Sequence, residues 1–139
     1  MDCIFCGIVN GTIPSSKVFE SDTIYAFLDL NPVHKGHTLI IPKKHFKDVT
    51  ELDTALGRDI FDAMQRVAKA VMEATGAQGF NVLQNNGRIA GQMVDHLHWH
   101  IIPRFADDGL GMWPQGKYAS MDEMNATAAK IAALVKGSA

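Results

Sequence analysis

The sequence predicts one domain of mixed α and β structure, and three observations support that prediction. Five short segments have the composition or the alternation that is typical of β-strands. Two longer segments have the period of an amphipathic helix. With 139 residues, the chain is most simply a single domain that can bury a core. The strands are expected at residues 18–20, 23–28, 37–41, 79–83 and 96–102.

The first three predicted strands lie close together in the sequence. Residues 18–20 and 23–28 are joined tightly by a two-residue connection. Gly36 precedes the strand at 37–41, and Pro42 stops it. The two remaining strands follow only after a long helical segment.

From Thr50 the apolar pattern changes to a helical period, which predicts a helix up to residue 76. Thr50 with Asp53 resembles a capping box, and Gly76 suits a C-cap. Ser120 with Glu123 predicts the start of a C-terminal helix in the same way. Apolar residues of the long helix that should face a core are Leu52, Leu56, Ile60, Met64, Val67 and Val71; those of the last helix are Met124, Ile131 and Val135.

Composition excludes several classes of function. The chain is 47% hydrophobic and 20% charged, which is ordinary for a globular protein. A net charge of -2 gives no overall attraction to nucleic acid or to an anionic membrane, so neither is an expected partner. No apolar run approaches the roughly 20 residues of a membrane span, and no export signal is visible at the N-terminus. Two cysteines are too few for a disulfide scaffold, so the expected compartment is the cytoplasm.

Residues 96–102 alternate imidazole and apolar side chains strictly. Because side chains two apart on a strand share a face, His96, His98 and His100 should form one row. The apolar residues between them should face the core. A strand that only packs a core has no need of three titratable rings, so the row indicates a functional site.

Three interpretations of the row remain open from the residues alone. Metal ligation is one, although alternate strand residues lie about 6.5–7 Å apart and ligands of one zinc ion converge to about 2.0–2.1 Å from it. Two of the histidines could therefore share an ion more easily than three. Nucleophilic catalysis is another, in which one neutral imidazole attacks and its neighbours orient it or handle protons. The third is a solvated face that happens to carry histidines.

Cys3 and Cys6 form a C-x-x-C motif with three possible meanings. A structural zinc site needs four ligands, so two histidines would have to complete it. A redox motif would normally lie between a strand and a helix of a thioredoxin-like unit. Free cysteines also serve as small apolar side chains in a core. His45 and the lysines before it carry little information by themselves.

The polar, glycine-containing segment 84–92 leads into the histidine row. Backbone amides beside its glycines could hold phosphate oxygens, whereas Asn86-Gly87 also suits an ordinary hairpin turn. The segment lacks the pattern of a Walker loop. Asp29, which closes the second strand, is either a turn residue or an acceptor of hydrogen bonds from hydroxyl groups.

Residues 96–102 resemble the H-φ-H-φ-H-φ-φ motif that defines the histidine triad (HIT) superfamily of nucleotide hydrolases and transferases. The resemblance extends over about residues 3–105, and the C-terminal part is only loosely comparable. It implies a single HIT domain over residues 1–139, with a core at about 3–105 and an extension at 106–139. The flanking matches are Ile4-Phe5, Ile8, Ala26 to Asp29, Gly36-His37, Ile41 to His45, Gly91-Gln92 and Pro103-Arg104.

The resemblance implies an α+β fold with a five-stranded antiparallel sheet, one long helix and one C-terminal helix, usually paired into a homodimer. It also implies that His98 attacks the α-phosphorus of a nucleotide and that water then releases the nucleoside monophosphate. An imidazole suits this role because its ordinary pKa of about 6.5 leaves a neutral fraction at pH 7. By the same resemblance His100 orients His98 and contacts phosphate, and His37 supports the row from the neighbouring strand.

The resemblance also supplies a binding site for the nucleotide. Asn85, Gln92 and the backbone at Met93 and Val94 would hold the phosphate, and Asp29 would accept from the ribose hydroxyls. The phosphoramidase branch commonly has a serine where Met93 stands, so this chain departs from it there. The base pocket would be lined by Ile4, Phe5, Ile8, Phe27 and Leu30.

Zinc is favoured once the resemblance is taken into account. The phosphoramidase branch lacks the two cysteines, whereas a bacterial-type, Hint-like branch holds zinc with a C-x-x-C and two histidines. The four ligands here would be Cys3, Cys6, His45 and His96. His96 is therefore a candidate both for metal binding and for proton handling beside His98, and one ring nitrogen cannot do both.

The expected function is hydrolysis of nucleoside 5′-monophosphate derivatives, such as phosphoramidates, with a purine nucleotide as substrate and no organic cofactor. One alternative is hydrolysis of dinucleoside polyphosphates. Another is a zinc-stabilised nucleotide-binding or scaffolding protein with incidental catalysis. Transfer of a nucleotide to a second substrate is less expected, because the chain is short for a second pocket.

Overall fold

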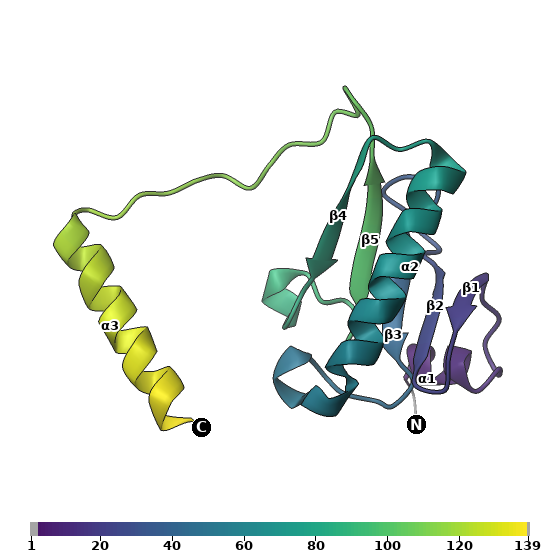
Figure 1. Ribbon diagram of the computed structural model, residues 1–139, viewed down its shortest axis with the longest axis horizontal. Helices are drawn as coiled ribbons and strands as arrows, with labels where there is room; N and C mark the ends of the chain where they lie inside the picture. The colour runs from purple at the N-terminus through teal and green to yellow at the C-terminus, as the bar shows by residue number, and fades with distance from the viewer. Residues whose placement is uncertain (1–2, 139) are drawn as a thin grey trace. The chain divides into compact units, whose positions relative to one another are not determined.

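A five-stranded antiparallel sheet is the framework of the first part of the chain (Figure 1). The computed structural model describes residues 3–138. Strand order is β1-β2-β3-β5-β4, and each neighbouring pair is antiparallel, which confirms the predicted fold class. The strands are β1 (Lys17–Glu20), β2 (Ile24–Leu28), β3 (Thr38–Pro42), β4 (Gly79–Gln84) and β5 (Trp99–Arg104).

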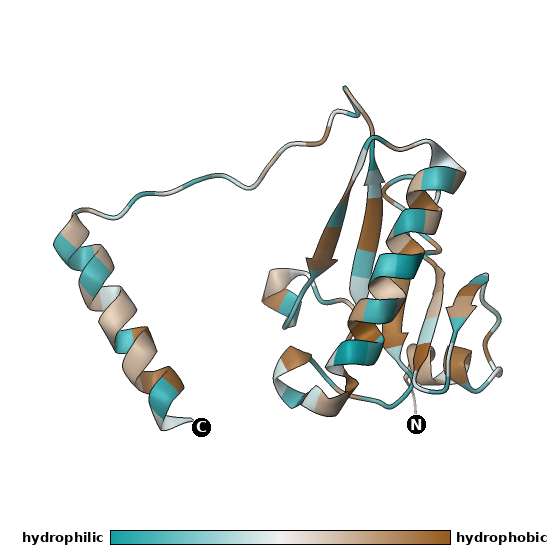
Figure 2. Ribbon diagram, viewed as in Figure 1, coloured by the Kyte–Doolittle hydropathy of each residue, from teal (hydrophilic) through white to brown (hydrophobic). Residues whose placement is uncertain are grey.

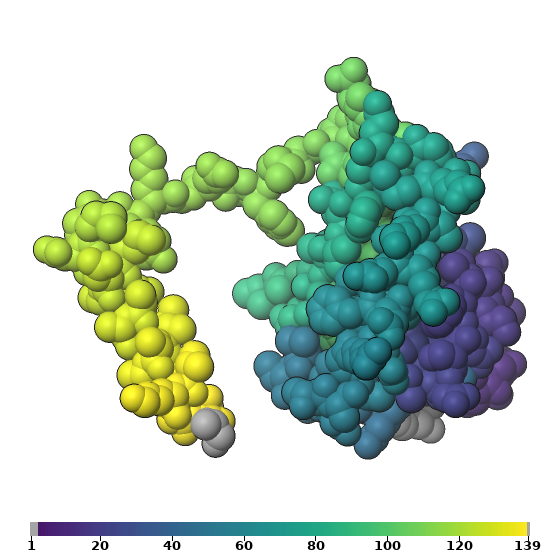
Figure 3. All heavy atoms as spheres, viewed as in Figure 1, coloured from purple at the N-terminus to yellow at the C-terminus, as the bar shows by residue number. Residues whose placement is uncertain are grey.

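Both faces of the central strands are covered. Successive side chains of a strand point to opposite sides, and the side chains on both sides are apolar here, so each face packs against a helix. On one side, Ile24, Ala26, Ile40 and Ile101 pack against α2 (Gly57–Thr75). The other side packs against the short helix α1 (Ile4–Val9). Its cluster consists of Phe5, Ile8, Tyr25, Phe27, Leu39 and Ile41. The apolar strands lie behind α2 in Figure 2, and α2 covers much of that face in the space-filling view (Figure 3).

The long helix begins later than the sequence indicates. Asp48 and Asp53 accept hydrogen bonds from the N–H groups of Thr50 and Ala55 and so cap two separate 3-10 turns, η1 (Val49–Glu51) and η2 (Thr54–Leu56). The predicted start at Thr50, with its capping box, is therefore wrong, and α2 starts at Gly57. Its end is as predicted, since Gly76 adopts the left-handed conformation with φ 71°.

The predicted apolar stripe of α2 is buried from its second turn onward. Ile60, Val67 and Val71 are buried against the sheet, each contributing roughly 1.5–3 kcal/mol relative to an exposed side chain. Leu52 and Leu56 pack against the same cluster from the turns before the helix. The stripe thus follows one continuous surface although the backbone changes its helical type.

Helix α1 was not expected from the sequence, because six residues are too few to show a helical period. Cys3 is its N-cap, and the Cys3 sulfur accepts a hydrogen bond from the N–H of Cys6 at 3.3 Å. The C-x-x-C motif therefore spans the first turn of a helix, which brings its two thiols to the same side.

Strand β5 begins at Trp99 and not at His96, so the prediction of a strand over residues 96–102 is wrong at its start. Continuing the ladder with β3 would place Leu97 opposite Pro42, which has no N–H to donate. The N–H of Leu97 instead donates to the carbonyl of Phe46 at 2.8 Å. The apolar side chains nevertheless lie as expected, with Trp99 and Ile101 packed toward α2.

The chain divides into two compact units, Met1–Asp108 and Gly109–Ala139. The second contains α3 (Met121–Gly137), whose N-cap Ser120 accepts from the N–H of Glu123 at 3.1 Å, as predicted. The division of the chain into a core at 3–105 and an extension stays a prediction. Among the described residues, no helix has both the length and the apolar character to cross a membrane.

Candidate active site and metal centre

The central histidine of the row, His98, lies just before β5 with its side chain buried. Its Nδ1 is 2.7 Å from the carbonyl oxygen of His96. A carbonyl oxygen only accepts hydrogen bonds, so Nδ1 carries the proton and Nε2 keeps its lone pair. The main chain therefore holds His98 in the tautomer whose free nitrogen can act as a nucleophile.

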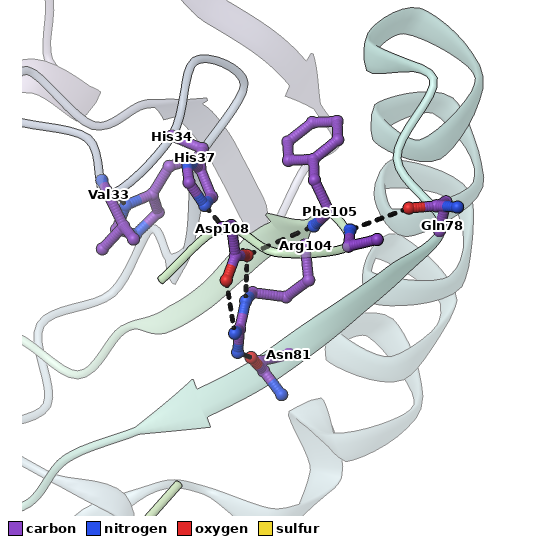
Figure 4. A network of polar contacts seen from close by, with 9 residues as sticks. Val33, His34, His37, Gln78, Asn81, Arg104, Phe105 and Asp108 are labelled. Carbon is purple, nitrogen blue, oxygen red and sulfur yellow. Dashed lines mark hydrogen bonds and ion pairs between the residues drawn. The ribbon is translucent and has the colours of Figure 1, made fainter. Parts of the chain in front are cut away.

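His37 and His100 form a second pair of rings beside His98. The N–H of Val33 donates to Nδ1 of His37 at 3.0 Å, so the proton of a neutral His37 is on Nε2 (Figure 4). That Nε2 is 2.9 Å from Nδ1 of His100 and donates to it. The centroids of the His98 and His100 rings are 5.0 Å apart. These contacts place three of the predicted catalytic histidines in one connected group.

The buried rings of this group are neutral at pH 7. Burial lowers the pKa of His98, against smaller raising effects of the His96 carbonyl and of Asp29. Burial also lowers the pKa of His37. Burial, followed by repulsion from His98 and His37, lowers the pKa of His100 to about 4. A neutral imidazole with a free lone pair is therefore available without help from an additional base.

The ring of His96 lies in a different cluster. Its Nε2 is 2.8 Å from the carbonyl oxygen of Pro42, so the proton is on Nε2 and Nδ1 has a free lone pair. That Nδ1 is 3.5 Å from the sulfur of Cys3 and 3.6 Å from the sulfur of Cys6. Nδ1 of His45 is 3.4 Å from the sulfur of Cys6. The four donor atoms all lie within 4.8 Å of one another, and they could hold a metal ion.

The donor set and its spacing fit zinc. A tetrahedral zinc ion with bonds of about 2.3 Å to sulfur and about 2.0–2.1 Å to nitrogen separates the two kinds of ligand by about 3.6 Å. The observed nitrogen–sulfur distances of 3.4–3.6 Å match that separation. Burial and the neighbouring Cys3 raise the pKa of the Cys6 thiol, so a Cys6 thiolate would need a cation beside it. The Pro42 carbonyl orients the His96 ring in the way that outer partners of metal ligands do.

His96 therefore contributes to the two clusters through different groups. Its ring faces the cysteines, and its main-chain carbonyl holds His98. Both ring nitrogens are occupied by these partners and by Pro42, which leaves no imidazole nitrogen directed at His98. The ring of His96 thus faces the cysteines and not His98, and which of its two predicted roles it performs, proton handling or metal binding, stays a prediction.

The loop between β4 and β5 is shaped by Gln92, which is fully buried. Its Oε1 accepts from the N–H of Gly87 at 2.8 Å, and its Nε2 donates to the carbonyls of Lys47 and Val94. Its amide group thus holds backbone rather than facing solvent, and the predicted contact of Gln92 with phosphate stays a prediction. No two-residue hairpin forms at Asn86-Gly87, because η3 (Arg88–Ala90) extends the connection.

The other predicted phosphate-binding residues lie on the same loop. Asn85 packs against Gly91, where an added Cβ would come within 3.2 Å of the Asn85 side-chain nitrogen. Gly91 also has a φ of 99°, so a larger residue there would strain the loop. Val94 packs against the cluster beneath α1, whereas the side chain of Met93 is exposed.

The structure brings together only part of the predicted base pocket. Phe5, Ile8 and Phe27 pack in one buried cluster, and the Phe5 ring is 5.1 Å from the His98 ring. Ile4 and Leu30 lie outside this cluster with exposed side chains. Asp29, at the end of β2, has one carboxylate oxygen 3.6 Å from Nε2 of His37 and the other bonded to the N–H of Asn31.

One polar network beside the site is not indicated by any pattern in the sequence. His34, on the loop that ends at His37, contacts the buried carboxylate of Asp108, and Arg104 binds the same carboxylate (Figure 4). Arg104 belongs to the Pro103-Arg104 flank of the histidine motif, which gives it no individual role. Asp108 lies beyond that motif, and an isolated aspartate carries no signal that could have identified it.

An antiparallel sheet with a helix on each face, carrying alternating histidines whose lowered pKa values favour the neutral form, is the arrangement expected of the histidine triad class of proteins. The chain belongs to the HIT family, since the HIT domain model matches residues 10–107. This result confirms the resemblance read from the sequence.

Individual relatives agree with that assignment. The chain is 45% identical over 138 residues to an adenosine 5′-monophosphoramidase of Schizosaccharomyces pombe, covering 98% of this chain and 100% of that protein. A crystal structure of a HIT family member from Bacillus subtilis matches with a TM-score of 0.89 at 41% identity, covering 95% and 96% of the two chains. A zinc-bound histidine triad family protein from Mycobacterium smegmatis matches with a TM-score of 0.75 at 33% identity, covering 96% and 98%.

Burial of neutral histidines predicts that the fold loses stability in acid. In the unfolded chain the pKa of these rings is about 6.5, whereas in the folded chain it is lower, at about 4 for His100. As pH falls through this window the unfolded chain binds more protons, so the free energy of unfolding decreases. We expect the melting temperature to fall steadily between pH 6.5 and 4, and a His100→Gln variant to lose part of that dependence. Titration of the His100 ring near pH 6.5 in an NMR experiment would contradict the prediction.

Proposed function

We propose that this protein hydrolyses nucleoside 5′-monophosphate derivatives, phosphoramidates above all, through a covalent intermediate on His98. The observation that carries the proposal is the hydrogen bond from Nδ1 of His98 to the His96 carbonyl, which leaves Nε2 free in a neutral, buried ring. The relative from Schizosaccharomyces pombe, named as an adenosine 5′-monophosphoramidase, supports the choice of substrate class.

In the first step, Nε2 of His98 forms a bond to the α-phosphorus and the P–N bond of the substrate breaks. The departing nitrogen keeps the bonding electron pair, takes up a proton from solvent and leaves as an amine; the water that attacks in the second step returns a proton to solvent. The ring then carries a positive charge, which the His96 carbonyl stabilises through the Nδ1–H bond. In the second step, water attacks phosphorus and displaces the imidazole, which releases the nucleoside monophosphate and restores His98.

The neighbouring residues orient the substrate and the rings that react with it. His37 donates to Nδ1 of His100, so the proton of a neutral His100 is on Nε2 and that nitrogen can donate to a phosphate oxygen. Asp29 lies beside His37 and offers a carboxylate to the ribose hydroxyls. His96 acts as a positioning residue through its carbonyl, while its ring belongs to the metal cluster. Phe5, Ile8 and Phe27 supply apolar surface for the base.

We also propose that the Cys3, Cys6, His45 and His96 cluster binds zinc with a structural role. Two thiolates and two imidazole nitrogens complete a tetrahedral set, which leaves no open position for a water nucleophile. The site would join α1, the segment after β3 and the segment before His98. Cysteines used as thiolate ligands suit a reducing compartment, which supports the expectation of a cytoplasmic protein.

A homodimer formed through β4 completes the proposal. β4 is the last strand of the sheet, and the side chains of Phe80 and Val82 are exposed along it. Phe80 lines a shallow apolar groove together with Ala68 and Met72 of α2. An apolar sheet edge of this kind invites pairing with another strand, and a twofold axis lets two copies cover the same surface.

Removal of the nucleophile tests the proposed reaction. His98→Ala should lower kcat for adenosine phosphoramidate by at least about 10³-fold, because no covalent intermediate can form. The variant should still bind adenosine monophosphate and melt near the wild-type temperature. Near-normal turnover would exclude His98 as the nucleophile, and partial rescue of His98→Gly by free imidazole would support it.

The same assay separates the alternative functions. Diadenosine tetraphosphate should be a poorer substrate than adenosine phosphoramidate for the wild-type protein. A reversed preference would favour a dinucleoside polyphosphate hydrolase. Tight nucleotide binding without turnover of either compound would favour a binding or scaffolding protein.

Removal of two ligands tests the zinc site. The wild-type protein should contain about one zinc ion per chain, and a chelator should lower its melting temperature, because a metal bound only by the folded state stabilises it. The Cys3→Ser, Cys6→Ser double variant should contain no zinc, melt at a lower temperature and show no further response to chelator. A metal-free wild type, or an unchanged melting temperature in the double variant, would contradict the zinc site and show that the cysteines serve only as small apolar side chains.

A charge on either edge of the sheet tests the dimer. Light scattering should give the wild-type protein twice the 15.2 kDa mass of one chain at micromolar concentration. Phe80→Asp should give the mass of a single chain, because the carboxylate would be buried in the contact through β4. Val18→Asp, on the opposite edge strand β1, is the matched control and should remain dimeric. A wild-type protein that scatters as one chain would refute the dimer.

A further inference from the structure

The loop between β2 and β3 carries two residues of the proposed site, and one long-range contact restrains its middle. Asp29 and His37 lie at the two ends of this loop. Between them, Nε2 of His34 is 3.1 Å from a carboxylate oxygen of Asp108 (Figure 4). The His34 ring also stands edge-to-face on Phe105, with ring centroids 5.3 Å apart. These contacts tie the loop to the chain that follows β5.

Asp108 is a firm anchor for the loop. Its side chain is only 6% exposed, and both of its oxygens bind the guanidinium of Arg104, at 2.7 Å and 2.9 Å. A bidentate pair of this kind fixes direction as well as distance. The N–H of Phe105 donates to the same carboxylate, and Arg104 also donates to Asn81 on β4. The carboxylate is therefore positioned by two strands of the sheet.

Two hydrogen bonds of one tight turn connect His34 and its neighbour Val33 to His37, so the position of His37 depends on that of His34. The N–H of His37 donates to the carbonyl of His34 at 3.0 Å. The N–H of Val33, the residue before His34, donates to Nδ1 of His37 at 3.0 Å. Because Val33 is adjacent to His34, a shift of His34 moves the N–H that donates to Nδ1 of His37. That donor is what directs the proton of His37 to Nε2 and toward His100.

We infer that His34 and Asp108 are a pair of positioning residues that hold His37 in the tautomer that donates to His100. Neither residue needs to touch the substrate. Their effect on the reaction rests on the proposed function, since it acts through the orientation of His100 beside His98. The pair should therefore govern kcat more than KM. The apolar contacts to the base come from other elements, and Asp29 is held at the base of the loop by its N–H, which donates to the His37 carbonyl at 2.9 Å.

A matched pair of substitutions at His34 tests this inference. Gln can still donate to Asp108 from a nitrogen at a similar reach, whereas Leu has a similar size and no donor. Asp108 keeps Arg104 as its partner in both variants, so the fold should tolerate the change. We expect His34→Leu to lower kcat for adenosine phosphoramidate by about 10–100-fold, the scale of a misplaced catalytic group, with KM within about threefold of wild type. His34→Gln should stay close to wild type in both.

The tautomer of His37 supplies a readout that does not depend on turnover. Long-range proton–nitrogen NMR spectra of histidine rings distinguish a protonated Nε2 from a protonated Nδ1. We expect a single Nε2–H form of His37 in the wild type and in His34→Gln, and a mixture of forms in His34→Leu. Should His34→Leu melt at a much lower temperature, Asp108→Asn provides a second route, because it weakens the acceptor for His34 and should also give a mixture.

The outcomes separate this inference from the proposed function. A wild-type protein without phosphoramidase activity would refute the function, and a mixed His37 tautomer in His34→Leu would still support the positioning role. An unchanged tautomer in both His34→Leu and Asp108→Asn would overturn the inference whatever the activity. A fall in kcat that His34→Gln shares with His34→Leu would overturn it as well, because the hydrogen bond to Asp108 would then be irrelevant.

Discussion

Two hydrogen bonds of His96, one made by its ring and one by its main-chain carbonyl, are the constraint on which the site depends. Its ring donates from Nε2 to the carbonyl of Pro42, which turns Nδ1 toward the two cysteines. Its own carbonyl accepts from Nδ1 of His98, which frees the opposite nitrogen of that ring. A single residue thus joins the end of β3, the cluster of two cysteines and two histidines, and the proposed nucleophile. A ladder that continued from β5 through this residue would compete for the same groups, so the strand ends where the site begins.

Burial is the second physical feature on which the histidine row depends, because it lowers the pKa of the rings. Imidazole rings removed from water favour the neutral form, and each buried ring here has a hydrogen-bond partner that offsets the loss of solvent. Among the described residues, no buried side-chain nitrogen or oxygen lacks a partner. The network therefore sets tautomers and suppresses protonation together. A row of solvated histidines with the same sequence would do neither.

Local patterns in the sequence predicted those parts of the fold in which a single periodicity dominates. The stripe through Ile60, Val67 and Val71 identified the long helix and its buried side, and Gly76 identified its end. Short apolar runs bounded by turn residues identified β2 and β3. The failures fall where short-range hydrogen bonds compete with that periodicity. Aspartate side chains close 3-10 turns before α2, and helix α1 is too short to display a period.

The sequence by itself determined which functional groups the site contains, namely three alternating histidines, a C-x-x-C pair and a glycine-containing loop. It also determined the family, because that combination is specific. Only the tertiary structure decided which of these residues lie together and which tautomer each histidine adopts. Cys3 and His96 are brought together although 93 residues separate them in the chain. The tautomers of His37, His96 and His98 are set by Val33, Pro42 and His96 through their main-chain groups. Nearly every residue carries these same main-chain groups, so no sequence pattern can indicate which of them will meet an imidazole ring.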